Sequence, residues 1–329
     1  MIFPLGYIED DKTYVLVNLT SPVYQEVKEN KMSGQFGYAG SILRVDLTKK
    51  SISTSPTTDY SERFLGGRGI AAKIYWDEVP PETEAFDPEN KLIFITGPLA
   101  GFTGLAASRW QICGKSPVTT PEFFSYANLG GSWGAHLKFA GYDGIVIQGK
   151  SDKPVYLFIH DEDVEIKDAS FIWGKSTVET REALKEIHGR DTRVVATGPV
   201  GENLVNMAIV FADDDSAGSA GFGAVMGSKK LKAIAVKGSR KLPPAYPDRL
   251  TTLRKYVREL RRDAPTIWAC GYHMPYIEDN PKFKKDACWG CISGCARAIY
   301  VADDGKTGKF TCQAPMVYYS LSWSSGVFL

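Results

Sequence analysis

The sequence predicts an α+β protein, in which a domain built on β-sheets is followed by the start of an α-helical domain. Short β segments bounded by glycine fill the chain from Tyr38 to about residue 240, and signals of helix initiation are sparse there. After Pro243 and Pro244 the apolar residues recur at helical spacing instead. We therefore expect an extension at 1–37, a sheet-built domain at 38–242 and a truncated helical region at 243–329.

The strands are predicted from apolar alternation and from glycine at segment ends. Residues 42–47 alternate as a half-buried strand. The later candidates are 92–97, 109–114, 144–149, 155–160, 164–168, 193–198, 207–212 and 233–238. This pattern favours a mixed α+β domain over a regular βαβ repeat.

Helices are predicted at a few places within the sheet-built domain. One is expected at 67–77 and another near 133–139. Ser176 and Glu179 form a capping box that opens a third helix, and Gly189 ends it.

The region after residue 243 begins with a predicted amphipathic helix. Asp248 can cap it, and its apolar positions recur at helical spacing: Leu250, Leu253, Val257 and Leu260. The chain then stops at Leu329 within an apolar stretch. Because about 90 residues is short for a separate domain, we interpret the chain as the N-terminal part of something larger.

The overall composition excludes several classes of function. The chain has 329 residues, 43% of them hydrophobic and 23% charged, with a net charge of +1. Such a balance favours neither nucleic acid nor an anionic membrane surface. We expect no membrane span, since no apolar run reaches roughly 18–20 residues, and no secretory signal, so a cytoplasmic protein is predicted. Six cysteines are too few for a disulfide scaffold.

Three of the cysteines lie close together in a C-x2-C-x3-C pattern, which we call the cysteine clip: Cys288, Cys291 and Cys295. Thiolates grouped in this way select soft metals. An iron–sulfur cluster is favoured over zinc, because structural zinc usually takes two paired ligand sets and no second pair follows. Three sulfurs imply that a fourth ligand lies elsewhere.

Four glycine-rich turns interrupt the predicted strands, at 65–69, 97–101, 128–131 and 217–223. Glycine lets backbone N–H groups approach a ligand and can form a concavity for anions. With Arg109 and Asn128 nearby, the turns predict a large phosphorylated cofactor that lies over a sheet. The P-loop motif is absent, and no dinucleotide-binding fingerprint is supported.

Taken in order, these motifs resemble the tungsten-containing aldehyde:ferredoxin oxidoreductase family. The segments that carry the resemblance are 38–47, 64–69, 97–99, 130–131, 137–143, 198–204 and 223–233, followed by the clip. The resemblance extends from Tyr38 to the C-terminus. It implies that the sheet-built domain binds pterin, and that two molybdopterin-type cofactors hold tungsten, or molybdenum, through their dithiolenes.

The resemblance also implies roles for individual residues. Asn128 matches an asparagine whose backbone helps to bind the Mg²⁺ that bridges the pterin phosphates, and Arg109 matches an arginine beside the pterin. Gly130 and Gly131 match glycines that approach the pterin closely. The clip matches three ligands of a [4Fe-4S] cluster, whose fourth ligand in the family comes from a C-terminal domain that is missing here.

Three departures from the family pattern stand out. Residues 214–219 replace a segment that usually carries arginines, with Ser219 aligned to one of them. The chain ends before the second pterin-binding segment. Cys312 is unusual for aldehyde-oxidising members; a cysteine in this region ligates tungsten in the class II benzoyl-CoA reductase branch. Cys312 could also be the fourth cluster ligand or a small buried side chain.

The resemblance implies an oxidoreductase that converts aldehydes to carboxylic acids and passes electrons through the cluster to ferredoxin or an electron-transfer subunit. The substrate would be a small aldehyde or an acyl-CoA, and the protein would act as an oligomer or in a complex, without nucleic acid. A benzoyl-CoA-reductase-like catalytic subunit is the first alternative, and a non-catalytic pterin-binding or scaffold chain is the second. No histidine is assigned a catalytic role.

Overall fold

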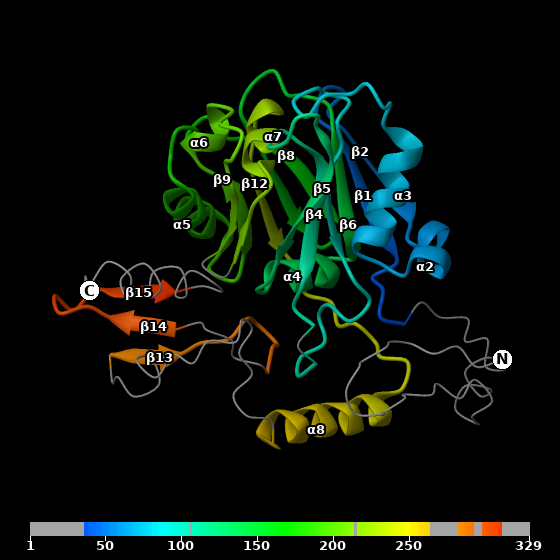
Figure 1. The fold of residues 1–329 in the computed structure, drawn as a ribbon, viewed down its shortest axis with the longest axis vertical. Coiled ribbons are helices and arrows are strands. Elements are labelled where there is room, and N and C mark those ends of the chain that lie inside the picture. Colours follow the sequence, from blue (N-terminus) through cyan, green and yellow to red (C-terminus); the bar gives the residue numbers. More distant parts are fainter. Residues whose placement is uncertain (1–35, 106, 214–215, 264–281, 293–297, 311–329) are drawn as a thin grey trace. The chain divides into compact units, whose positions relative to one another are not determined.

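The structure is a computed structural model that describes residues 36–105, 107–213, 216–263, 282–292 and 298–310 (Figure 1). The chain divides into two units, Met1–Gln35 and Phe36–Leu329, and all described residues belong to the second. Cys295 and Cys312 lie outside the described residues.

The first sheet has six strands in the order β2-β1-β6-β3-β4-β5. Their bounds are Ser41–Asp46 (β1), Ser51–Pro56 (β2), Leu92–Thr96 (β3), Trp110–Ser116 (β4), Phe123–Leu129 (β5) and Tyr142–Gln148 (β6). β1 and β6 are parallel, and every other pair of neighbours is antiparallel. The strand β3 is buried along its whole length, as expected for a strand covered on both faces.

The second sheet also has six strands, in the order β11-β10-β9-β12-β7-β8. Their bounds are Val155–His160 (β7), Asp163–Asp168 (β8), Arg193–Thr197 (β9), Val210–Ala212 (β10), Ser216–Gly218 (β11) and Leu231–Lys237 (β12). The pair β7 and β12 is parallel, and the remaining neighbours are antiparallel. Both sheets are therefore mixed, which confirms the α+β class.

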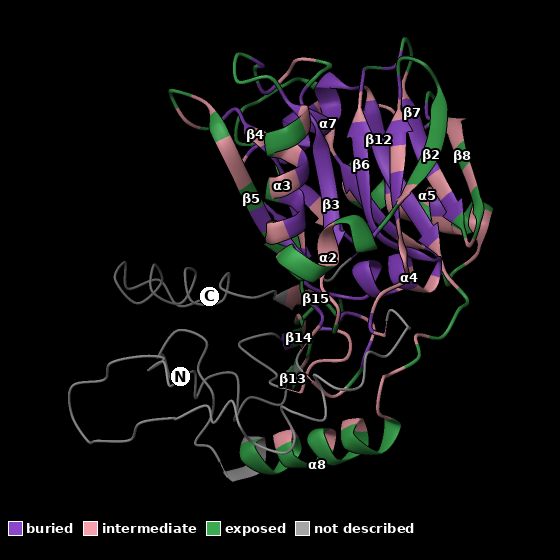
Figure 2. Cartoon of the chain, turned by 90° about the vertical axis from the view of Figure 1, so that its right-hand side faces the viewer, coloured by how far each residue is buried: buried purple, intermediate pink, exposed green. Residues whose placement is uncertain are grey.

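Two buried helices, α4 (Trp133–Phe139) and α7 (Phe222–Ser228), lie between the sheets. All seven residues of α7 are buried. A helix that is apolar on every side needs such an interior position. Figure 2 shows that the buried residues gather on the central strands and on these two helices. One core cluster joins them, with Trp110, Trp133 and Phe222 among its largest side chains.

The outer faces of the sheets are covered by further helices. α2 (Thr58–Phe64) and α3 (Arg68–Glu78) lie on the first sheet, where Ile70, Ala71 and Ile74 join a second apolar cluster. α5 (Thr177–His188) covers the second sheet, and the short α6 (Pro199–Glu202) follows β9. The predicted capping box at Ser176 is present, with both reciprocal hydrogen bonds formed.

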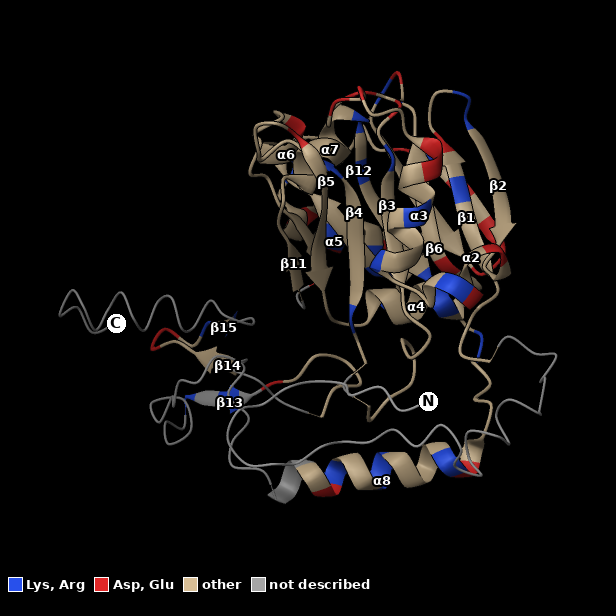
Figure 3. Cartoon of the chain, turned by 45° about the vertical axis from the view of Figure 1, so that its right-hand side comes forward, with Lys and Arg blue, Asp and Glu red and all other residues tan. Residues whose placement is uncertain are grey.

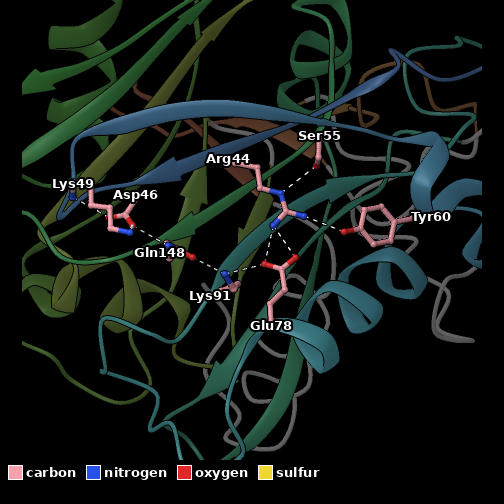
Figure 4. A network of polar contacts seen from close by, with 8 residues as sticks. All are labelled: Arg44, Asp46, Lys49, Ser55, Tyr60, Glu78, Lys91 and Gln148. Atoms are coloured by element: carbon pink, nitrogen blue, oxygen red, sulfur yellow. Dashed lines mark hydrogen bonds and ion pairs between the residues drawn. The ribbon is translucent and has the colours of Figure 1, made fainter.

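A polar network fastens α3 to the first sheet (Figure 4). The guanidinium of Arg44 donates two hydrogen bonds of 2.8 Å to the carboxylate of Glu78, and Lys91 Nζ lies 2.9 Å from the same group. Lys91 also donates to Gln148 Oε1, which continues the network to β6. Burial alone would raise the pKa of Glu78, but the hydrogen bonds from Lys91 and Arg44 outweigh it and lower that pKa.

Beyond residue 243 the structure describes one helix and a small sheet. The helix is α8 (Pro247–Asp263), where one was predicted. A three-stranded antiparallel sheet follows, formed by β13 (Phe283–Lys285), β14 (Ala298–Val301) and β15 (Thr307–Phe310). The sequence did not predict these strands. Leu253 and Leu260, which belong to the predicted apolar side of α8, are 45% and 53% exposed.

The charged side chains are mixed in sign. Figure 3 shows both signs on α2, α3 and α8, in keeping with a net charge of +1. In the described part of the chain, no helix combines the length and the apolar character that crossing a membrane requires.

Candidate functional site

Two of the predicted glycine turns leave the first sheet at the same end. β3, β4 and β5 are antiparallel neighbours, with Thr96 opposite Trp110 and Trp110 opposite Leu129. The turn that follows β3 and the turn that follows β5 therefore emerge beside the start of β4. This is the end of the sheet at which α4 lies (Figure 1).

The glycine turn at 65–69 lies beside the turn that follows β3. A Cβ atom on Gly66 would lie 3.2 Å from the Cα of Gly97, so the two turns touch. Gly67 has a φ of +53°, and a Cβ there would lie 2.5 Å from Oε1 of Gln111. The positive φ therefore favours glycine at position 67, and an added side chain would also have to displace the end of the Gln111 side chain.

Gln111 connects this turn to the end of β5. Its Nε2 donates a hydrogen bond of 3.2 Å to Oδ1 of Asn128, its partner across the two strands. Gln111 holds one side of the Asn128 amide. Asn128 is exposed, so the rest of its side chain is accessible to a ligand. Arg68, just after Gly67, stacks its guanidinium 4.1 Å from the centre of the Tyr126 ring.

The backbone N–H and C=O groups of Gly130 both form hydrogen bonds. Its N–H donates to Oγ of Ser216 at 3.0 Å, and its carbonyl accepts from Nε1 of Trp110 at 2.9 Å. The ring of Trp110 in turn packs against Trp133, with 4.5 Å between centroids. Because both polar groups of Gly130 are already paired, its contribution to the site is the absence of a side chain.

Cys288 of the cysteine clip lies where a side chain on Gly130 would otherwise point. A Cβ atom on Gly130 would lie 3.1 Å from Sγ of Cys288 and 3.7 Å from Nη1 of Arg109. Cys288 is 7% exposed, whereas Arg109 is exposed. Three of the predicted site residues, far apart in the sequence, therefore meet at one point.

The rest of the described clip is a tight turn held by neighbouring loops. The N–H of Cys291 donates to the carbonyl of Cys288 at 2.9 Å, and Gly290 has a φ of +70°. The carbonyl of Gly290 accepts from the N–H of Gly104 at 2.8 Å. The ring of Trp289 lies edge-on to Phe139 of α4, at 6.0 Å.

These residues fit the groups that the sequence predicts. Sulfur ligands from one glycine-containing turn suit an iron–sulfur cluster, and Cys288 and Cys291 both lie in the described part of the clip. The guanidinium of Arg109 suits an anionic or polar cofactor edge beside Gly130. The described residues contain no group of three or more His, Cys, Asp or Glu side chains placed to bind a metal. Cys295, the third sulfur, is outside them.

The other predicted residues have different surroundings. Gly131 is buried and has a φ of +82°. In the fourth glycine segment, Gly218 belongs to β11, and a Cβ there would lie 2.9 Å from Leu129; the segment supports β5 from inside the fold. Burial raises the pKa of Cys113 to about 12, so this thiol is inert at neutral pH. His136 is on α4 with its Nδ1 unpaired among the described residues.

Sequence reasoning missed Gln111 and Ser216. Gln111 could have been found as the cross-strand partner of Asn128, had β5 been predicted. Ser216 gives no comparable signal, because its contact with Gly130 joins two different sheets.

Comparison with known proteins gives the family. Residues 42–238, more than half of the chain, match the family described as the N-terminal domain of aldehyde ferredoxin oxidoreductase. The chain belongs to this family. Its members are oxidoreductases, so the resemblance drawn from the sequence motifs is confirmed. A tungsten-containing aldehyde ferredoxin oxidoreductase of Pyrococcus abyssi is 45% identical over 330 aligned positions, which cover 89% of this chain and 53% of that protein.

Two further proteins of different description are also similar to this chain. The WOR-like subunit of an aliphatic sulfonate oxidoreductase from Pyrococcus furiosus is 39% identical over 68% of this chain and 39% of its own length. Among solved structures, the active-site complex BamBC of benzoyl coenzyme A reductase, in complex with 1,5-dienoyl-CoA, is similar with a TM-score of 0.76 and 32% identity. That match covers 88% of this chain and 51% of the other. The chain thus spans about half the length of the first relative and of this structure.

Proposed function

We propose that this chain forms the pterin-binding and cluster-proximal part of a tungsten oxidoreductase that oxidises aldehydes to carboxylic acids and passes the electrons to ferredoxin. The contact of Gly130 with Cys288 and Arg109 carries the proposal. It sets the first sulfur of the predicted cluster beside the glycine turns predicted to approach the pterin. A cofactor that exchanges electrons with a cluster needs this proximity.

In this proposal the bound tungsten pterin would supply the redox chemistry, in which an aldehyde and water give a carboxylate, two electrons and three protons. The chain's own residues bind and orient. Arg109 would hold a polar edge of the pterin, and the Asn128 backbone would help to bind Mg²⁺ between the phosphates. Cys288 and Cys291, with Cys295, would hold the [4Fe-4S] cluster that receives electrons.

The glycine turns have a separate task, which is to let the cofactor come close. Gly67 and Gly131 have positive φ values that favour glycine, and Gly130 leaves room for the sulfur of Cys288. Trp110 and Ser216 fix the Gly130 peptide, so the turn is preorganised before a cofactor binds.

Anaerobic purification followed by metal analysis tests the proposal. We expect tungsten or molybdenum, about four iron atoms per chain, and a low-temperature electron paramagnetic resonance signal after reduction. A well-folded protein without tungsten, molybdenum or iron would instead support the non-catalytic scaffold. Aldehyde-dependent reduction of ferredoxin, with the whole protein, then tests the substrate and the electron acceptor.

A benzoyl-CoA-reductase-like subunit is the second candidate, favoured by the similarity to the BamBC structure. Cys312, outside the described residues, would then ligate tungsten directly. Replacing Cys312 with serine distinguishes the two. Tungsten X-ray absorption that loses a sulfur neighbour supports the second candidate, and an unchanged spectrum removes Cys312 from the metal. Loss of iron alone would identify Cys312 as the fourth cluster ligand.

A further inference from the structure

Lys138, near the end of α4, is fully buried and is bonded to backbone oxygens of two other segments. Its Nζ donates hydrogen bonds to the carbonyls of Gly97 at 3.0 Å, of Pro98 at 3.3 Å and of Gly37. Burial lowers the pKa of Lys138 to about 8, and the nearby Asp143 carboxylate opposes this effect. An ammonium group without water persists only when oxygen atoms surround it.

Asp143 completes this buried cluster. One carboxylate oxygen lies 3.8 Å from Nζ of Lys138. The carboxylate also accepts hydrogen bonds from the N–H groups of Ala39, at 2.9 Å, and Gly40, at 2.8 Å, and from Oγ1 of Thr57 at 2.7 Å. The lysine and the aspartate therefore fix the chain before β1 and the turn after β3 in one place.

The loop that follows β3 is in contact with the cysteine clip. The N–H of Gly104 donates to the carbonyl of Gly290 at 2.8 Å, and a Cβ on Gly290 would lie 3.5 Å from the Cα of Thr103. On the other side of the clip, the residue after Lys138 is Phe139, whose ring contacts Trp289. The last turn of α4 thus reaches the clip by two routes.

We propose that Lys138 is a positioning residue for the cysteine clip, acting through the loop 97–104. The hydrogen bonds and the ion pair of the lysine go to Gly37, Gly97, Pro98 and Asp143, and none of these is a described clip residue. Lys138 fixes the backbone at Gly97 and Pro98, and the same loop then presents Gly104 to Gly290. The inference rests on the proposed function, because the position of the clip matters for a bound cluster.

Lys229 is a matched control for Lys138. It is also fully buried, and its Nζ donates to three carbonyls: Asp87 at 3.4 Å, Pro88 at 3.1 Å and Gly149 at 3.3 Å. Burial lowers its pKa to about 7. These partners lie before β3 and after β6, at the opposite end of the first sheet from the clip. Both variants therefore remove a buried ammonium that donates to three carbonyls. Lys138 also lies within ion-pair distance of a buried carboxylate, that of Asp143, and its carbonyl partners Gly97 and Pro98 belong to the loop that contacts the described part of the clip.

The test compares Lys138→Met with Lys229→Met in the full chain, reduced and free of metal. Alkylation of Cys288 by iodoacetamide and hydrogen exchange at Gly104 are followed by peptide mass spectrometry. We expect Lys138→Met to speed both about tenfold, because a hydrogen bond from a charged donor is worth at least that factor in a local opening equilibrium. Lys229→Met should change both by less than about twofold. Equal effects in the two variants, or no effect in Lys138→Met, would overturn the proposal.

Hydrogen exchange of the wild-type chain provides a second test, which is needed if Lys138→Met does not fold. The amides of Ala39, Gly40 and Gly104 should open in one event, with the same dependence on denaturant. If Gly104 opens separately and more readily, the proposal is wrong. Iron reconstitution of the wild type tests the proposed function independently. Failure to bind iron would overturn that function, whereas the contrast between the two lysine variants would still support the positioning of the clip.

Discussion

Sγ of Cys288 and the α-carbon of Gly130 are so close that a single added methyl group would lie 3.1 Å from the sulfur. This is tighter than ordinary van der Waals contact, so one of the two must move if position 130 carries a side chain. The backbone at Gly130 does not have a positive φ, and alanine is therefore allowed there by conformation. Any effect of Gly130→Ala would therefore come from the contact of the added methyl group with Cys288 and Arg109.

Under the proposed function, in which Cys288 is a cluster ligand, Gly130→Ala should displace Cys288 and weaken iron binding about tenfold, the usual size of a change directly behind a metal ligand. Iron content after limited reconstitution, together with the midpoint potential of the cluster, measures this effect. Gly198→Ala is the control, because the nearest atom to a Cβ there is an ordinary 3.7 Å away, in Thr177. Equal iron binding in both variants would show that the contact does not constrain the cluster.

Arg109→Gln should reduce the tungsten or molybdenum content while leaving the iron content unchanged. The exposed guanidinium adjoins Gly130 and is proposed to hold the pterin, and losing such a charged contact typically costs about tenfold in affinity. Metal analysis of the anaerobically purified variant checks this. Arg63→Gln, at an exposed arginine on α2, is the control. Parallel loss of iron and tungsten would argue instead for a general collapse of the site.

His136 should make the protein less stable as the pH falls from about 6.5 to about 4. Burial, assisted by Arg193, lowers its pKa from 6.5 to about 4, although Asp191 acts in the other direction. Within that window the unfolded chain holds a proton on His136 that the folded chain lacks, so the free energy of unfolding rises with pH and falls on acidification. After allowance for partial solvent access, the contribution is about 1–2 kcal/mol.

Urea denaturation at several pH values measures this contribution as the difference between the wild type and His136→Phe. The difference in unfolding free energy should vary with pH between 4 and 6.5. His160→Phe, which replaces an exposed histidine at the end of β7, is the control for the loss of an imidazole. If His136→Phe keeps the pH dependence of the wild type, another group is responsible.

Ser176→Ala should destabilise the fold by about 1 kcal/mol, because it removes the capping box at the start of α5. Thermal or urea unfolding checks the magnitude, with Ser53→Ala on the exposed strand β2 as the control. α5 packs on the outer face of the second sheet, so the metal content should not change. A loss of metal would connect α5 to the site in a way that these contacts do not predict.

Much of the fold could be predicted where local and tertiary preferences agree. β3 and β6 are apolar and end near glycine, and the predicted bounds of α4 match the observed ones, Trp133–Phe139. The buried helix α7 was missed. Its sequence contains Gly223 and Gly227, which lower helix propensity, and burial between the sheets stabilises the helix instead.

The candidate site was predicted residue by residue, but its geometry was not. Asn128 was identified without its partner Gln111, because β5 has no clear apolar alternation and was not predicted as a strand. The contact between Gly130 and Cys288 depends on how the chain, after the last strand of the second sheet, comes back to the end of the first sheet. Local sequence patterns carry no information on such a return.

The parallel pairing of β1 with β6 determines when the site can form. Gln148 on β6 bonds to Asp46 on β1 across 102 residues, and β3, β4 and β5 belong to the segment between them. β3, β4 and β5 are therefore synthesised before β6, the strand that connects them to β1. The sheet is complete only when β6 has inserted between β1 and β3. Such non-local pairing is slow, so we infer that the proposed cofactor site forms late in folding and that any cofactor binds after β6 has closed the sheet.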